Sequence, residues 1–235
     1  GTTLESTSRD SRPPLTDMIG GGPFQLERGQ WTDDTSMALC LAESLLANDG
    51  LDPLDLIRRF LRWRDQGENS CTGKCFDIGG TIGTALSRFE RTGDPLAGSS
   101  DPNTAGNGSL MRLSPVSIFW AAEPDLAERA AAEQSRTTHA APAAVDACRV
   151  YARLLVRAIA GEPKQELLKP WPDTADLDPA VAAVMAGSWR GKKRGQIQSS
   201  GYVVHSLEAA LWAVDQAEDF RGAVLAAANL GGDAD

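Results

Sequence analysis

The chain has 235 residues, of which 42% are hydrophobic and 23% charged, with a formal net charge of −9 at pH 7. An acidic protein repels the phosphates of nucleic acids and of anionic membranes, which argues against sequence-independent binding to either. The length suffices for one sizeable core and the sequence has no linker-like run, so we expect a single domain spanning residues 1–235.

Four cysteines, Cys40, Cys71, Cys75 and Cys148, are scattered through the chain. Cys71 and Cys75 are four residues apart, but no second Cys or His pair lies near them, which argues against a zinc site. Reduced thiols are typical of cytoplasmic proteins, and we expect that location. The sequence also predicts no membrane-spanning segment and no signal peptide.

We expect residues 1–30 to form a long loop, because they include five glycines and three prolines. A loop of this length in a compact domain is usually functional or mobile. It contains Glu5, for which the simplest interpretation is a solvated surface carboxylate.

A helix is predicted to begin after Thr32, which is a suitable N-cap, with Asp33 and Asp34 in its first turn. Met37, Leu41 and Leu45 repeat every four residues and predict the buried face of this helix. The acidic pair is therefore expected at the open end of a buried helix. Taken alone, this pattern is also typical of an ordinary helix start.

Two more helices are predicted in the first half of the chain. Residues 54–64 are amphipathic, and their arginines are expected to form a solvated face. Residues 73–81 are rich in glycine and open a helix that carries Ile82, Leu86 and Phe89 on its apolar face. Asp77 lies in this glycine-rich stretch, either as a functional carboxylate or as an N-cap.

The segment 104–112 contains Asn107 between two glycines, followed by Ser109 and Arg112. Its amides and the Ser109 hydroxyl are groups that bind phosphate, and binding loops of this kind often lie on a rigid scaffold. The structural alternative is a tight turn in which Arg112 pairs with an acidic neighbour.

The second half also predicts helices. A stripe of Val145, Cys148, Ala152, Leu155 and Ile159 follows Thr138 and His139, and helices are predicted at 204–215 and 220–229, with a surface connection at 163–179. The chain ends in Gly231-Gly232-Asp233-Ala234-Asp235, where carboxylates alternate after a turn that lets backbone approach a ligand. Carboxylate and hydroxyl oxygens are the ligands that Mg²⁺, Mn²⁺ or Ca²⁺ prefer.

About eight segments show the helical repeat, and none shows a sustained strand-type alternation, which predicts an all-α fold. We expect a compact single-domain bundle in which the start of the Thr32 helix and the Asp233 loop meet at one rim.

Five stretches together resemble the ADP-ribosylglycohydrolase family, which includes the dinitrogenase reductase-activating glycohydrolase. They are WTDDTSMALCLAESLL from residue 31, NGSLMRLSPV from residue 107, the Thr138-His139 pair, SSGYVVHSLEAALWA from residue 199 and the terminal NLGGDAD. The resemblance covers nearly the whole chain in the family's order. It implies an all-helical fold, two divalent cations (Mg²⁺ or Mn²⁺) and removal of ADP-ribose from a modified side chain. Family members have a helix before the segment that matches Gly1-Thr2-Thr3-Leu4-Glu5, and a Thr and another helix after Asp-Ala-Asp, so the resemblance implies a domain truncated at both ends.

The resemblance also assigns roles to residues. The implied metal ligands are Thr32, Asp33, Asp34, Asp233 and Asp235; the implied catalytic groups are Asp34, Asp77 and Glu5; the implied substrate contacts are Asn107, Gly108, Ser109, Met111, His139, Gly201 and Tyr202. Tyr202 is expected to stack on adenine or guard the pocket, although a packing role is equally typical of an aromatic residue.

The function expected from this resemblance is hydrolysis of ADP-ribose from ADP-ribosylated protein side chains, with arginine favoured. Two alternatives belong to other classes: an inactive ADP-ribose-binding or structural relative, and a metallohydrolase of another ADP-ribose derivative. The sequence determines neither the oligomeric state, the target protein nor the choice between Mg²⁺ and Mn²⁺.

Overall fold

The computed structural model describes residues 2–234, and the predicted all-α fold is confirmed for this part of the chain. Within it the only β pairing is four isolated bridges. The helices are α1 (Asp33–Asn48), α2 (Pro53–Gln66), α3 (Gly80–Thr92), α4 (Ser114–Phe119), α5 (Pro124–Arg136), α6 (Pro142–Ile159), α7 (Lys164–Leu167), α8 (Pro179–Met185), α9 (Val203–Gln216) and α10 (Phe220–Ala228), with 3₁₀ turns at Thr2–Leu4, Pro102–Thr104 and Arg194–Gln196.

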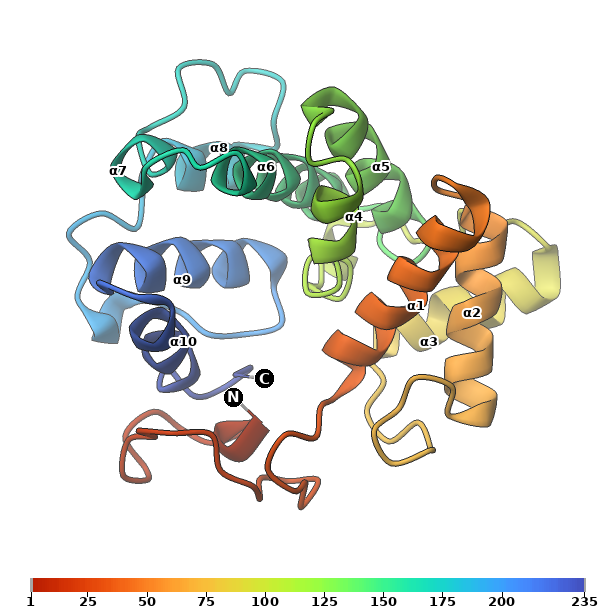
Figure 1. Cartoon of the computed structure of the whole chain (residues 1–235), viewed down its shortest axis with the longest axis horizontal. Coiled ribbons are helices and arrows are strands. Elements are labelled where there is room, and N and C mark those ends of the chain that lie inside the picture. The colour runs from red at the N-terminus through yellow and green to blue at the C-terminus, as the bar shows by residue number, and fades with distance from the viewer. Residues whose placement is uncertain (1, 235) are drawn as a thin grey trace.

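Helix α6 holds the arrangement together, because it packs against α5, α4, α8 and α9. In Figure 1, helices α1, α2 and α3 lie at the right, beyond α4 and α5, and α9 and α10 lie at the left, below α6. One apolar cluster runs through α1 to α6 and on into α8 and α9. A single continuous core of this kind is what a chain of this length is expected to build.

Helix α1 begins where the sequence predicts. Thr32 is its N-cap, with an extended backbone at φ −97° and ψ −160°. Met37 and Leu41 are fully buried and Leu45 is 1% exposed, so the stripe with a four-residue repeat faces the core. The packing of this stripe against α2 and α4 fixes the direction of α1 and hence the position of its acidic first turn.

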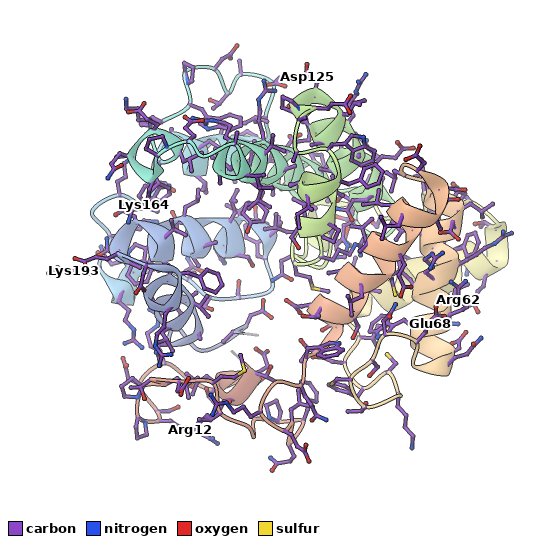
Figure 2. The ribbon with its side chains drawn as sticks, in the orientation of Figure 1. Arg12, Arg62, Glu68, Asp125, Lys164 and Lys193 are labelled. Atoms are coloured by element: carbon purple, nitrogen blue, oxygen red, sulfur yellow. The ribbon has the colours of Figure 1, made fainter. Side chains whose placement is uncertain are left out.

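Helix α2 is capped at both ends, by Asp52 at its start and by Gly67 at its end. The Asp52 carboxylate accepts hydrogen bonds from the amides of Leu54 and Asp55, and Gly67 ends the helix at φ +73°. A Cβ atom at Gly67 would lie 2.1 Å from the Gly73 carbonyl oxygen, so only glycine fits there. Three of its arginines pair with acidic residues: Arg59 with Asp55 and Glu43, Arg62 with Glu68 (Figure 2), and Arg64 with Asp65 and Glu90.

Helix α6 differs from its predicted stripe at the last turn. Cys148 and Ala152 are fully buried, whereas Ile159 is 51% exposed, because the buried residues of the helix end at Val156. The connection after it contains the short helix α7. There the Lys164 ammonium donates hydrogen bonds to the carbonyls of Val214, Asp215 and Ala217 and so caps the C-terminus of α9.

The two ends of the described chain lie side by side (Figure 1). The amide of Ser6 donates to the Gly232 carbonyl at 2.7 Å, and the amide of Gly232 donates to the Thr7 carbonyl at 2.8 Å. Arg9 adds hydrogen bonds to the carbonyls of Leu230, Arg194 and Ile197. The predicted N-terminal loop therefore wraps against the segment that carries Asp233.

In residues 2–234, no helix combines the length and apolar character that crossing a bilayer requires.

Adjacent leucines on α1 offer a test of this packing. Leu45 is 1% exposed and Leu46 is 76% exposed. We expect Leu45→Ala to lower the free energy of unfolding by about 2–5 kcal/mol, since it leaves a cavity in the core. Leu46→Ala is the matched control and is expected to change it by less than about 0.5 kcal/mol. Urea denaturation measures both, and equal effects would contradict the orientation of α1.

Candidate functional site

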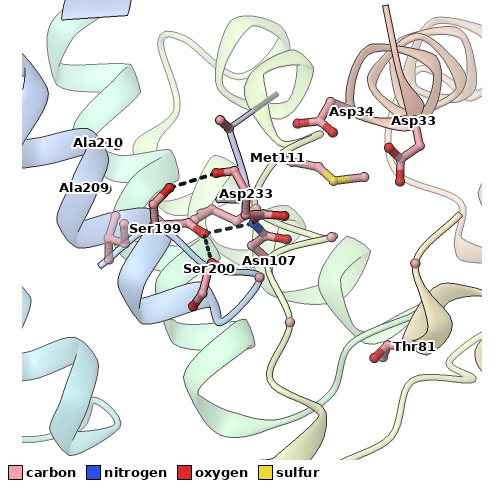
Figure 3. Close-up of a pocket in the computed structure, with 18 of the residues that line it drawn as sticks. Asp33, Asp34, Thr81, Asn107, Met111, Ser199, Ser200, Ala209, Ala210 and Asp233 are labelled. Atoms are coloured by element: carbon pink, nitrogen blue, oxygen red, sulfur yellow. Dashed lines mark hydrogen bonds between the residues drawn. The ribbon is translucent and has the colours of Figure 1, made fainter. Parts of the chain in front are cut away.

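A cleft of about 530 Å³ opens between the start of α1, the two ends of the described chain and the inner face of α9. Segments 77–82, 106–111 and 199–201 contribute much of its wall, together with His139, Tyr151 of α6 and Ala227 of α10. Figure 3 shows Asp33 and Asp34 on one side of this cleft and Asp233 with Asn107 on the other. Residues predicted from opposite ends of the sequence therefore share one cavity.

Five carboxylates line the cleft, from Glu5, Asp33, Asp34, Asp77 and Asp233. Among the lining residues that the structure describes there is no lysine or arginine. Like charges gathered in one cavity repel one another unless a cation joins them. Helix α1 contributes to the arrangement, since the partial positive charge at its N-terminus favours the two aspartates of its first turn.

Thr32 precedes this acidic pair but does not line the cleft, and it is only 3% exposed. Its hydroxyl makes no capping hydrogen bond to the helix and lies 3.5 Å from a carboxylate oxygen of Asp34. The hydroxyl therefore points to the acidic side chain of the first turn and not to the backbone amides that a capping threonine serves.

Asp233 is positioned by polar residues of two other segments. Asn107 donates its side-chain amide to Oδ2 of Asp233 at 2.6 Å and to the Ser206 hydroxyl at 2.9 Å. The Ser199 hydroxyl donates to the Asp233 carbonyl oxygen at 3.0 Å, and dashed lines mark these contacts in Figure 3. Hydrogen bonds to a carboxylate are charge-assisted and fix its orientation.

The backbone just before Asp233 depends on glycine. Gly232 has φ +75°, and a Cβ atom there would lie 2.4 Å from the Ser199 carbonyl oxygen. Beyond it, the Ala234 amide donates to a carboxylate oxygen of Glu5 at 2.6 Å. Glu5 is thus placed beside Ala234; Asp235, a predicted metal ligand, lies outside the described residues.

The donor set of the cleft fits hard divalent cations, because it consists of carboxylate and hydroxyl oxygens without a competing cationic side chain. Within residues 2–234, however, no three acidic, His or Cys side chains converge closely enough to hold one ion. The carboxylates of the cleft also affect the pKa of the neighbouring Cys75 thiol. Burial, then Asp33 and Asp77, raise the pKa of this thiol to about 11, so it stays protonated and is a poor metal ligand.

The loop that contains Asn107 is anchored on both sides. The backbone amide of Asn107 donates to the Gly201 carbonyl at 2.9 Å, and the Asn107 carbonyl accepts hydrogen bonds from the amides of Leu110 and Met111. Ser109 is fully buried, and its hydroxyl accepts hydrogen bonds from Ser135 and Cys148. The predicted phosphate contact by the Ser109 hydroxyl therefore has no access to the cleft.

Arg112 lies directly behind this loop and is fully buried. The expected alternative, in which it pairs with an acidic neighbour, is not what the structure shows. Its guanidinium donates to the side chain and carbonyl of Gln134, the Thr137 hydroxyl and the Gly108 carbonyl, and it lies 4.6 Å from the centre of the Phe60 ring. Every hydrogen-bond acceptor in this set is electrically neutral.

His139 lines the cleft from a buried position, 2% exposed. The Thr138 hydroxyl lies 2.8 Å from its Nδ1, and the ring sits against Gly106 and Gly108. Burial and, second, the charge of Arg112 lower the pKa of His139 to about 3. The imidazole is therefore neutral at physiological pH, with one nitrogen as a donor and the other as an acceptor.

Most of the predicted site residues line the cleft: Glu5, Asp33, Asp34, Asp77, Asn107, Gly108, Met111, His139, Gly201 and Asp233. Asp77 is not the N-cap of α3, since Gly79 takes that position. Tyr202 is 37% exposed, lies outside the lining and stacks edge-on to His205 with ring centres 5.0 Å apart.

The prediction omitted several lining residues that bear hydroxyl groups, namely Thr81, Tyr151, Ser199, Ser200 and Ser206. Ser199 and Ser200 directly precede Gly201 in a stretch already singled out, so their hydroxyl-rich sequence was an available signal. Ser206 carries no comparable signal, because it lies inside the mainly apolar helix α9.

Comparison with known proteins agrees with this geometry. The sequence profile of the ADP-ribosylglycohydrolase family matches residues 1–235. Two relatives are each named ADP-ribosylarginine hydrolase Tri1: one from Pseudomonas putida is 46% identical over the whole chain, and one from Serratia proteamaculans is 43% identical. The chain spans 62% and 63% of their lengths.

A more distant relative is the ADP-ribosyl-[dinitrogen reductase] glycohydrolase of Rhodospirillum rubrum, which is 29% identical over 93% of this chain and 68% of its own length. Among solved structures, a chain described as an ADP-ribosylglycohydrolase-related protein complex is 42% identical. It superimposes with a TM-score of 0.86 over 99% of this chain and 76% of its own.

The buried neutral His139 predicts a pH dependence of stability. Its pKa is about 3 in the folded protein, whereas an ordinary histidine titrates near 6.5. Between these values the unfolded chain binds a proton that the native state does not, so acidification destabilises the native state by about 1.4 kcal/mol per pH unit. We expect His139→Asn to remove this contribution. Unfolding curves at pH 7, 6, 5 and 4 should show the difference between the two proteins changing by this slope, and parallel curves would contradict the assignment.

The contact between His139 and the loop predicts a glycine requirement. A Cβ atom at Gly108 would lie 2.8 Å from Cε1 of His139 and 3.0 Å from Cδ1 of Ile82. We expect Gly108→Ala to destabilise the protein by about 1–3 kcal/mol, since it overpacks a buried contact. Gly83→Ala on α3 is the control: a Cβ atom there meets nothing within 4 Å, and we expect no loss of stability. Thermal melting that ranks the two variants in the opposite order would refute the packing described.

Proposed function

This chain belongs to the ADP-ribosylglycohydrolase family, and from that premise we propose that it hydrolyses the bond between ADP-ribose and an arginine side chain of a modified protein. The observation that carries the proposal is the cleft lined by five carboxylates and, among the described residues, by no lysine or arginine. The names of the two Tri1 relatives support the same substrate class.

The charge of the cleft supports arginine as the modified residue. An ADP-ribosylated arginine keeps a guanidinium group at the bond to be cleaved, and its positive charge is attracted by carboxylates. A modified serine presents a neutral ether oxygen there and gains nothing from the same field. We therefore favour the N-glycosidic bond to arginine over the O-glycosidic bond to serine.

We propose that Thr32, Asp33, Asp34, Asp233 and Asp235 hold two divalent cations, Mg²⁺ or Mn²⁺. The donor chemistry of the cleft and the orientation of the Thr32 hydroxyl towards Asp34 support this set. Such ions, when bound, would lower the pKa of a coordinated water and bind vicinal hydroxyls of a sugar. The role of the protein is to fix the donors, which Asn107 does for Asp233.

Proton transfer falls to the carboxylates nearest the reacting bond. We propose Asp34, Asp77 or Glu5 for this role, since all three line the cleft. Their negative charges also stabilise a sugar carbon that becomes positive as the bond to the leaving group breaks. The leaving arginine takes up one proton, and the attacking water gives up one.

ADP-ribose would lie along the loop 106–111, opposite the acidic wall. Gly108, Met111 and Gly201 form part of this surface, and neutral His139 offers a hydrogen-bonding nitrogen from behind it. Tyr202, on the exposed side of Gly201, is proposed to contact adenine at the edge of the cleft. The free state of all four cysteines supports action in the cytoplasm.

The assignment of Asp34 predicts loss of turnover on its removal. We expect Asp34→Ala to reduce release of ADP-ribose from an ADP-ribosylated arginine peptide by at least about 10³-fold with saturating Mg²⁺, since it removes both a proposed ligand and a charge beside the reacting bond. Asp125→Ala is the control, because this side chain is 82% exposed and lies on α5, away from the cleft (Figure 2). Turnover of Asp34→Ala at the wild-type rate would show that the roles are wrongly assigned.

Analysis of the products separates the proposal from its alternatives. Free ADP-ribose and unmodified arginine peptide support the proposed hydrolase. Binding of ADP-ribose without any product indicates an inactive binding relative. Release of AMP indicates cleavage of the diphosphate by a different metallohydrolase.

A further inference from the structure

A serine near the start of α9 lies between two segments of the cleft wall. Ser206 lines the cleft and is half-buried, and its hydroxyl oxygen lies 2.9 Å from the side-chain nitrogen of Asn107 and 3.4 Å from the carbonyl oxygen of Ser200. The other residues of α9 that line the cleft are apolar, namely Leu207, Ala209 and Ala210. Packing at this position therefore requires no hydroxyl group, and the contacts of Ser206 point to a polar role.

We propose that Ser206 is a positioning residue that holds the side-chain amide of Asn107 in the orientation that donates to Asp233, and thereby raises the affinity of the cleft for divalent cations. This inference rests on the proposed function, because it takes Asp233 as a ligand of those cations. The role assigned to Ser206 is separate from contact with the cations or with ADP-ribose.

The first support is the direction of the hydrogen bonds around Ser206. A carbonyl oxygen can only accept, so the Ser206 hydroxyl donates its single hydrogen to the Ser200 carbonyl. The oxygen of the same hydroxyl then accepts, and Asn107 donates one of its two side-chain N–H groups to it. Ser206 therefore requires the nitrogen of the Asn107 side chain, and not its oxygen, on this side.

The second support is the partner that the Asn107 side-chain nitrogen has besides Ser206. This nitrogen also donates to Oδ2 of Asp233 at 2.6 Å, as Figure 3 shows, and a hydrogen bond to a carboxylate is charge-assisted. A flipped Asn107 would face the carboxylate with its own carbonyl oxygen, and two acceptors repel each other. The flip would also break the contact with Ser206 unless that hydroxyl gave up the Ser200 carbonyl. Ser206 therefore favours the one orientation in which Asn107 holds Asp233.

The third support is that the backbones of both partners are fixed by groups other than Ser206. The Gly201 carbonyl accepts the backbone amide of Asn107 at 2.9 Å. The Ser199 hydroxyl donates to the Asp233 carbonyl at 3.0 Å. Removal of the Ser206 hydroxyl should therefore release the Asn107 side chain and leave both segments in place.

The orientation of Asp233 matters for cation binding, because a carboxylate that is already held in place loses less freedom when it binds an ion. Residues that hold metal ligands through hydrogen bonds change metal affinity by roughly 10- to 100-fold when they are replaced. Ser206 acts one step further away, through Asn107, so we expect an effect at the lower end of this range.

The test measures binding of Mn²⁺ to the metal-free full chain by electron paramagnetic resonance, which detects the free ion. We expect Ser206→Ala to raise the Kd of Mn²⁺ on the order of 10-fold, because the Asn107 side chain can then turn away from Asp233. Ser206→Thr keeps a hydroxyl group, and its Kd should stay within about threefold of wild type. A wild-type Kd for Ser206→Ala would overturn the proposal.

A double-mutant cycle shows whether Ser206 acts through Asn107. We expect Asn107→Ala to raise the Kd of Mn²⁺ by itself, and Ser206→Ala added to that variant to change the Kd by less than about twofold. If Ser206→Ala weakens Mn²⁺ binding equally with and without the Asn107 side chain, the proposed route through Asn107 is wrong.

Ser117→Ala is the matched control. The Ser117 hydroxyl also donates to a backbone carbonyl, that of Ala152, but this serine is fully buried on α4 and does not line the cleft. We expect its Kd for Mn²⁺ to stay within about twofold of wild type, since distant sites act independently. Weakening by Ser117→Ala as large as that by Ser206→Ala would indicate a general loss of stability and overturn the proposal.

A measurement on wild type decides the matter if the Ser206 variants fail to fold. NMR follows exchange of the two Asn107 side-chain amide protons with water, and the exposed Asn103 provides the reference. We expect the Asn107 protons to exchange at least about tenfold more slowly, because Ser206 and Asp233 accept hydrogen bonds from this amide. Equally fast exchange overturns the inference alone, whereas a wild-type protein that binds no divalent cation overturns the proposed cation site and this inference with it.

Discussion

The pairing of the two ends of the described chain is the constraint on which the site depends. Backbone hydrogen bonds between Ser6, Thr7 and Gly232 hold the N-terminal loop against the segment before Asp233, and Ala234 completes the pairing by donating to Glu5. They bring Glu5 and Asp233, from opposite extremes of the sequence, into one cavity, where Asn107 and Ser199 also hold Asp233. The buried stripe of α1 does the same for Asp33 and Asp34, so the acidic wall rests on one packed helix and one pair of strand-like segments.

The electrostatics of the cleft divide into two layers. Carboxylates occupy the surface, where solvent and cations reach them, and the one arginine behind loop 106–111 is kept out of water among neutral partners. The separation prevents a direct ion pair that would neutralise both layers. It leaves an acidic cleft surface and a positive charge buried behind loop 106–111.

The sequence predicted most of the fold because the information is local. The four-residue repeat of α1 and the amphipathic pattern of α2 require only neighbouring residues, and both helices were confirmed. The site was harder to predict where it depends on contacts between residues far apart in the sequence. The Ser109 side chain faces the core because it is hydrogen-bonded to Ser135 and Cys148. Arg112 has a neutral partner because Gln134 of α5, more than twenty residues along the chain, packs beside it. The periodicity of a sequence does not indicate which side of a loop will face a cavity built by many separate segments.

The close packing of the His139 ring against the backbone of loop 106–111 limits which substitutions the protein can tolerate there. The imidazole sits against Gly106 and Gly108, and even a methyl group at 108 would intrude on its van der Waals radius. Substitutions at 108 and 139 are therefore epistatic: the free energies of the two single changes do not add. A larger residue at 108 is compatible only with a smaller one at 139, so variants and natural descendants of this protein are expected to exchange the two positions together.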